Sequence, residues 1–187
     1  MFDDIQKMAH ILLPDHCHSC HAKERGLFVA IALYIMNSKK HKSFGEIYRI
    51  LMGDVAKELS SALKLSIHKA GLLLINNFLN QEKKAQAKTI ISLASHLELW
   101  GNPLIDYATS KSDFNPADFR REKATLYVGL QPGDIKRLRP LMQFFYQYIA
   151  QSLCTPADNK HDTHGVLFIL DEFPSLGKMD VFTSSIP

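Results

Sequence analysis

The chain has 187 residues, of which 46% are hydrophobic and 22% charged, and its formal net charge is +3. These values are typical of a soluble globular protein with a sizeable core and argue against general disorder. Three cysteines are too few for a disulfide framework, and the longest apolar runs are too short to cross a bilayer. The mildly basic charge permits contact with nucleic acid without requiring it.

The first hundred residues predict one helix after another, because apolar side chains recur at helical spacing without the alternation typical of strands. Residues 21–37 are apolar on more than one side, so we expect a central, buried helix there. Ser43 followed by Glu46 is a capping-box pattern that opens a short helix. We predict an all-α domain over residues 1–118. Its expected helices cover residues 2–13, 21–37, 43–51, 55–65, 69–79 and 82–99.

A cluster of cysteine and histidine precedes the central helix. Its core, Cys17-His18-Ser19-Cys20-His21, matches C-x-x-C-H, the spacing that attaches a c-type haem, and also looks like a metal knuckle. A structural zinc site needs about four ligands. The cluster supplies at most three of them, and His161 and His164 are the only distant candidates. We therefore favour a polar turn with incidental cysteines and expect no bound metal or haem.

The pattern changes class after residues 109–115, a polar segment typical of a linker. A β-prone run at 125–130 is followed by a long amphipathic helix at 135–153. An unbroken apolar run at 166–170 then has the length of a strand. Strand, helix and apolar strand predict parallel strands buried on both faces. The predicted fold class is therefore mainly α, with a partial α/β domain over residues 119–187.

Two acids, Asp171 and Glu172, directly follow the apolar run at 166–170. An apolar strand ending in two carboxylates has the form of a Walker B motif, which delivers both groups to the edge of a sheet. The first acid holds Mg²⁺ through water, and the second deprotonates the water that attacks the γ-phosphate. The pattern alone leaves open the alternative that the acids only solubilise the end of a strand.

The continuation from Asp171 to Lys178, DEFPSLGK, resembles the DEFP-x-LG signature of type IV secretion coupling proteins, the TraG/TraD-like motor ATPases of bacterial conjugation and effector secretion. Ser112-Asp113-Phe114 before 125–128, and Pro132-Gly133-Asp134 before 137–141, also resemble that family. The resemblance implies a RecA-like nucleotide-binding domain with Walker B over 119–187. It further implies that the all-α domain is inserted between the Walker A and Walker B segments.

The same resemblance implies the chemistry and the setting. Asp171 would contact the nucleotide and Mg²⁺, Glu172 would be catalytic, and ATP and Mg would be the cofactors of the parent protein. The parent would be a homo-hexamer anchored at the cytoplasmic face of the bacterial inner membrane. Its partners would be DNA or protein cargo, relaxosome or effector adaptors, and components of the secretion channel, with the all-α domain in contact with cargo or relaxosome.

The chain departs from the family in one respect, because it contains no G-x-x-x-x-G-K-[ST] sequence, and its single Gly-Lys pair, Gly177-Lys178, follows the acids. We therefore expect a soluble, cytoplasmic internal fragment that binds no cofactor and is inactive alone, from a parent that hydrolyses ATP. The alternative is a non-catalytic helical interaction or adaptor module. A haem protein is disfavoured because haem is attached outside the cytoplasm.

Basic and aromatic side chains offer weaker signals. The loop from Lys39 to Lys42 could contact DNA phosphates, but a solvated turn is favoured. Arg137 and Arg139 could reach phosphates of a neighbouring subunit, but surface ion pairing is favoured. Trp100 and the aromatic residues of 144–148 are expected in core and interface rather than as base-stacking platforms.

Overall fold

The structure, a computed structural model, describes residues 1–14, 21–65, 67–154, 164–171, 173–177 and 179. The chain divides into two compact units, Met1–Lys111 and Ser112–Pro187, which are described separately. In the described part of the chain, no helix combines the length and hydrophobicity needed to cross a membrane.

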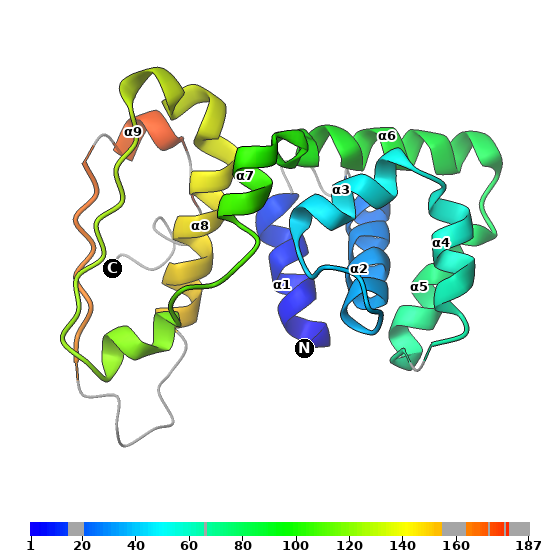
Figure 1. The fold of residues 1–187 in the computed structure, drawn as a ribbon, viewed down its shortest axis with the longest axis horizontal. Helices are drawn as coiled ribbons and strands as arrows, with labels where there is room; N and C mark the ends of the chain where they lie inside the picture. Colours follow the sequence, from blue (N-terminus) through cyan, green and yellow to red (C-terminus); the bar gives the residue numbers. More distant parts are fainter. Residues whose placement is uncertain (15–20, 66, 155–163, 172, 178, 180–187) are drawn as a thin grey trace. The chain divides into compact units, whose positions relative to one another are not determined.

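The first unit is built from helices, as predicted (Figure 1). Its helices follow the expected ranges closely, except that the helix expected at 55–65 ends at Ala62. Helix α6 runs across the direction of α2, and both pack against α3. The elements are α1 (Phe2–Leu12), α2 (Ala22–Met36), α3 (Phe44–Met52), α4 (Val55–Ala62), α5 (Lys69–Leu79), α6 (Lys83–Leu97), η1 (Glu98–Gly101) and α7 (Pro103–Ala108).

Helix α2 is the centre of this unit. Every residue from Leu27 to Ile35 is buried, so α2 has no solvated face over most of its length. Helices α1, α3, α4, α5 and α6 all contact it. The prediction of a central buried helix at 21–37 is confirmed.

Polar side chains set where several of these helices begin. The Ser43 hydroxyl accepts a hydrogen bond from the Glu46 N–H at 3.2 Å, which confirms the predicted cap of α3. Asp54 caps α4 in the same way. Helix α7 was not predicted, although its signal is present in the sequence: Asn102 caps it and Pro103 occupies its first turn.

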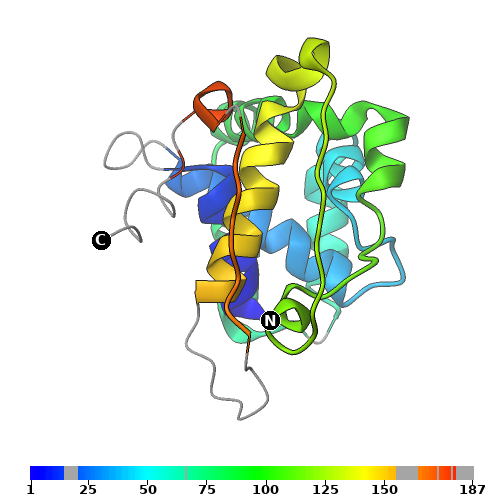
Figure 2. The ribbon, with the colours of Figure 1, turned by 90° about the vertical axis from the view of Figure 1, so that its left-hand side faces the viewer.

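The second unit contains η2 (Pro116–Arg120), η3 (Pro132–Asp134), α8 (Ile135–Cys154) and α9 (Phe173–Leu176). Helix α8 matches the predicted helix at 135–153 and includes Pro140. Figure 2 shows two extended stretches, residues 123–131 and 164–170, running along α8. A small buried cluster of Met142, Leu176 and Met179 joins α8 to the segment around α9.

The predicted α/β, RecA-like part with parallel strands is wrong for this structure, because no strand occurs among the described residues. The runs at 125–130 and 166–170 are extended, but they do not form a ladder. Leu167 is 81% and Ile169 84% exposed, where a strand in the middle of a sheet would bury both. An apolar, β-prone run becomes a strand only when neighbouring strands satisfy its backbone, and here the two runs lie along a helix instead.

A close approach between α3 and α7 requires glycine at position 45. A Cβ added to Gly45 would lie 1.9 Å from the Asp106 Oδ1 atom. Asp106 cannot move away freely, because its other carboxylate oxygen accepts a hydrogen bond from Arg49 Nη1 at 2.6 Å. The packing of α7 onto α3 therefore depends on the missing side chain.

We expect Gly45→Ala to destabilise the chain by about 1–3 kcal/mol, the usual cost of forcing a group into a packed site. The measurement is urea denaturation followed by far-UV circular dichroism. Gly26→Ala in α2 is the matched control, because its added Cβ meets only Leu74 at an ordinary 3.6 Å. Alanine favours helix over glycine, so the control should be neutral or stabilising. Equal stability of the two variants would contradict the packing argument.

Candidate functional site

The first acid of the predicted pair, Asp171, lies at the end of the second extended stretch. Asp171 is described and exposed, and α9 begins two residues later at Phe173, whereas Glu172 lies outside the described residues. The two carboxylates are therefore not seen together. Asp171 takes part in further contacts of its own and is not an isolated charge.

The turn after the acids is anchored to α8. The Gln143 side-chain amide donates a hydrogen bond of 2.7 Å to the Leu176 carbonyl, and Leu176 is buried against Met142. Gly177 follows with φ +79°, a left-handed conformation that favours glycine. Leu176 and Gly177 thus each have a structural role: the leucine fills the small core and the glycine allows the chain to turn.

Among the described residues, Asp171 by itself supplies only part of a magnesium site. Mg²⁺ is commonly held by one or two carboxylates, with phosphates and water completing the octahedron. Asp171 is an exposed carboxylate of this kind. In the described residues, no three His, Cys, Asp or Glu side chains come together as a complete metal cage.

The cysteine-rich cluster is only partly described. Cys17 and Cys20 lie outside the described residues, and so does His161. His21 precedes α2, and its ring contacts the ring of His96 edge-on, with the centroids 5.1 Å apart. His96 was not predicted, because it lies far along the chain on α6 and nothing in the sequence pairs it with the cluster.

The weaker signals resolve mostly as predicted. Arg137 pairs with Asp134, one helical turn away, at 2.8 Å, which is the favoured surface ion pair. The Arg139 Nε atom is buried and has no hydrogen-bond partner in the described part of the chain. Trp100 is buried in the core and donates a hydrogen bond to the Thr109 hydroxyl.

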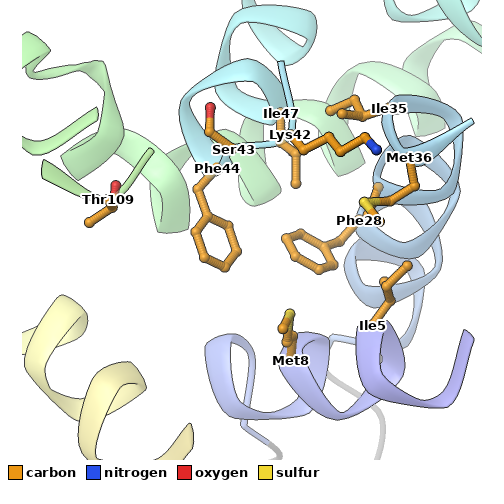
Figure 3. A pocket seen from close by; sticks show the side chains of 11 residues that line it. Ile5, Met8, Phe28, Ile35, Met36, Lys42, Ser43, Phe44, Ile47 and Thr109 are labelled. Atoms are coloured by element: carbon orange, nitrogen blue, oxygen red, sulfur yellow. The ribbon is translucent and has the colours of Figure 1, made fainter. Parts of the chain in front are cut away.

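An apolar cleft opens in the first unit between α1, α2 and α3, and sequence reasoning did not find it. It has a volume of about 240 Å³. Figure 3 shows Met8, Phe28 and Phe44 directed toward one another around the opening, with Ile5 and Met36 beside them. Its remaining lining residues are Ala32, Ile35, Lys42, Ser43, Ile47 and Thr109.

A basic pocket lined by Lys39, Lys40, His41, Lys42 and Ser110 adjoins this cleft. Lys40 is neutralised, because its ammonium lies 3.4 Å from Glu46 and 3.2 Å from Glu58. Lys39, His41 and Lys42 are exposed, and no carboxylate pairs with them in the described residues. We call these three residues the basic rim. Lys42 belongs to the rim and also lines the cleft.

A hydrogen bond between α2 and α4 supports the loop that carries the rim. The Tyr34 hydroxyl donates to the Glu58 carboxylate at 2.6 Å, and Lys40 donates to the other oxygen of Glu58. The Tyr34 hydrogen bond holds the pKa of Glu58 below its ordinary value, with a further contribution from Lys40. Burial raises the pKa of Tyr34, so it remains a donor at neutral pH.

Comparison with known proteins gives a consistent result. The family described as type IV secretory system conjugative DNA transfer matches residues 1–187. Protein VirD4 of Rhizobium radiobacter is 33% identical over 165 residues, which cover 87% of this chain and 24% of that protein. Protein VirD4 of Agrobacterium fabrum (strain C58) is 31% identical over 87% of this chain and 25% of its own length.

A shorter match extends the comparison to conjugation. The conjugal transfer protein TraG of Escherichia coli is 34% identical over 110 residues, which cover 54% of this chain and 17% of TraG. No solved structure matches the chain significantly. The chain spans about a quarter of the length of the VirD4 proteins that it matches.

The Tyr34–Glu58 pair predicts a pH dependence. A carboxyl whose pKa is lowered on folding contributes stability above its unfolded pKa, about 4.3, and that contribution is lost as the pH falls through the folded value. We expect Tyr34→Phe to lower the free energy of unfolding by about 1–2 kcal/mol at pH 7. The difference from wild type should shrink below pH 4.

Urea denaturation of both proteins at a series of pH values measures this effect. Tyr107→Phe is the control, because Tyr107 is 77% exposed and removal of its hydroxyl should change little. A Tyr34→Phe deficit that stays constant between pH 7 and pH 3 would show that the hydrogen bond does not act through the Glu58 charge.

Proposed function

We propose a function for this chain on the basis of its family: the chain belongs to the type IV secretory system conjugative DNA transfer family. The chain is part of a coupling protein, an ATP-driven motor that recruits DNA or protein substrates and moves them into a secretion channel. The observation that carries the proposal is the family match over residues 1–187, supported by the similarity to VirD4 and TraG.

The two acids are proposed to act in ATP hydrolysis in the parent protein. Asp171 would hold Mg²⁺, which neutralises charge on the phosphates when bound. Glu172 would accept a proton from the attacking water, the role of a general base. The anchored turn formed by Gln143, Leu176 and Gly177 would fix the position of the chain just after both acids.

The first unit is proposed to contact cargo or relaxosome. The support is its self-contained helical core and the apolar cleft with its charged neighbour. The parent would work as a homo-hexamer at the cytoplasmic face of the bacterial inner membrane. The support for this part of the proposal is the resemblance to coupling proteins together with the family match.

A non-catalytic helical interaction module is the second candidate. The observation that favours it is the predominance of helix, with no strand among the described residues to form a nucleotide-binding sheet. In that case the chain would bind a component of the transfer machinery without turning over ATP.

Deletion of the gene that encodes this chain is expected to abolish conjugative DNA transfer, because the substrate would no longer reach the channel. Mating assays that count recipients carrying the plasmid provide the measurement, and the intact gene supplied in trans should restore transfer. A plasmid that transfers by an independent system serves as the control. Undiminished transfer from the deletion strain would refute the proposed role.

The acids give a second, biochemical test on the full-length parent protein. Glu172→Gln is expected to abolish ATP turnover and leave ATP binding nearly intact, because the amide keeps the shape but cannot accept the proton. Asp171→Asn is expected to weaken Mg²⁺-dependent nucleotide binding as well, because a charge facing the metal is lost. Parallel binding and hydrolysis assays separate the two effects. Normal hydrolysis by Glu172→Gln would contradict the catalytic assignment of Glu172.

A further inference from the structure

We infer that the apolar cleft and the basic rim together form a docking site for an acidic peptide segment that inserts an apolar side chain into the cleft. The inference rests on the proposed function, in which the first unit contacts cargo or relaxosome, and it specifies the chemistry of such a partner. It concerns a cleft and a loop of the first unit that the acid pair does not use.

The size of the cleft selects a side chain as its occupant. An apolar cavity of about 150 Å³ suffices for a benzene ring, whereas pockets for cofactors and drug-sized ligands span about 300–1,000 Å³. A cleft of about 240 Å³ lies between these limits. It therefore accommodates one large or two small apolar side chains.

The lining of the cleft determines what that side chain must be. Ile5, Phe28 and Ile47 are buried and form apolar walls, while Met36 at the end of α2 is 37% exposed. Methionine adapts its shape to different partners, which suits a site that receives a side chain from another molecule. A polar side chain would lose its hydration here and gain few partners in return.

The basic rim determines the charge of the segment around the anchor. The neighbouring Lys40 already has carboxylate partners, because its ammonium lies close to both Glu46 and Glu58. Lys39 and Lys42 lie in the same loop and have no carboxylate partner among the described residues. Carboxylates of a partner would complement them, and charge complementarity sets orientation and speeds association.

Lys42 connects the two halves of the site. Figure 3 shows its side chain extending along the cleft, with the ammonium near Met36. The aliphatic part of the lysine therefore adds to the apolar wall, while the charge remains at the mouth of the cleft. A segment that places an apolar anchor next to an acidic residue satisfies both features at once.

Nucleic acid fits this site less well. Phosphates could bind the basic rim, but they would leave the apolar cleft unused. Contact between phosphates and lysines does not require the aromatic side chains that line the cleft. The structure thus favours a peptide, and DNA becomes an alternative that the experiment can detect.

Fluorescence anisotropy with the 187-residue chain tests the inference. The probe is a fluorescein-labelled synthetic peptide with Phe and Leu anchors separated by Glu and Ala residues. Two matched peptides replace either the anchors by Ser or the Glu residues by Gln. We expect the first peptide to bind and each matched peptide to bind at least about tenfold more weakly, since tenfold corresponds to the loss of one modest contact.

Paired variants locate the binding site. Met36→Glu should weaken binding about tenfold or more, because it places a charge at the apolar mouth and repels the acidic peptide. Its control is Met52→Glu, which makes the same change at a 58% exposed methionine outside the cleft. Lys42→Gln should weaken binding and reduce its salt dependence. Its control is Lys88→Gln at an exposed position on α6.

Three outcomes would overturn the inference. The first is that none of the peptides binds the wild-type chain. The second is that Met36→Glu and Lys42→Gln bind as well as their controls, with all variants folded by circular dichroism. The third is that a labelled single-stranded oligonucleotide binds tightly through Lys42 while Met36→Glu has no effect, which would assign the loop to nucleic acid. None of these results depends on DNA transfer in cells, so failure here and failure of the proposed function are distinguishable.

Discussion

The burial of α2 is the constraint on which the first unit depends. A helix whose residues from Leu27 to Ile35 are all buried must have neighbours on every side, because each large apolar side chain left in water would forgo about 1.5–3 kcal/mol. The helices α1, α3, α4, α5 and α6 supply those neighbours. The amphipathic helices of the unit have only one apolar face each, and α2 is where those faces converge.

The surface features of this unit follow from the way the chain leaves α2. The loop after Asn37 has to return to α3, and Lys40 fixes it through Glu46 on α3 and Glu58 on α4. Lys39 and Lys42, in the same loop as the paired Lys40, are exposed beside the mouth of the cleft. At the start of α3, the missing side chain of Gly45 admits Asp106, which pairs with Arg49. Charge pairs and close packing thus hold the first turn of α3 against its neighbours.

The second unit shows how a local pattern and its structural outcome can differ. The sequence around 166–170 has the composition of a buried strand, yet the structure leaves Leu167 and Ile169 exposed. The residues after the acids behave differently, because their places are fixed within the unit: Leu176 packs on α8 and Gly177 adopts the positive φ that only glycine accepts readily. Composition alone could not decide whether partner strands would be present.

The sequence by itself determined most helices of the first unit, the cap of α3 and the family. Helical periodicity and the Ser43 cap depend on residues a few positions apart, and the DEFPSLG stretch from Asp171 to Gly177 is a contiguous motif. Only the tertiary structure decided which lysine of the 39–42 loop is paired, that His96 lies against His21, and that an apolar cleft opens between α1, α2 and α3. Each of these features joins residues that are distant in the chain, and such contacts are set by how whole helices pack around α2, which no local pattern encodes.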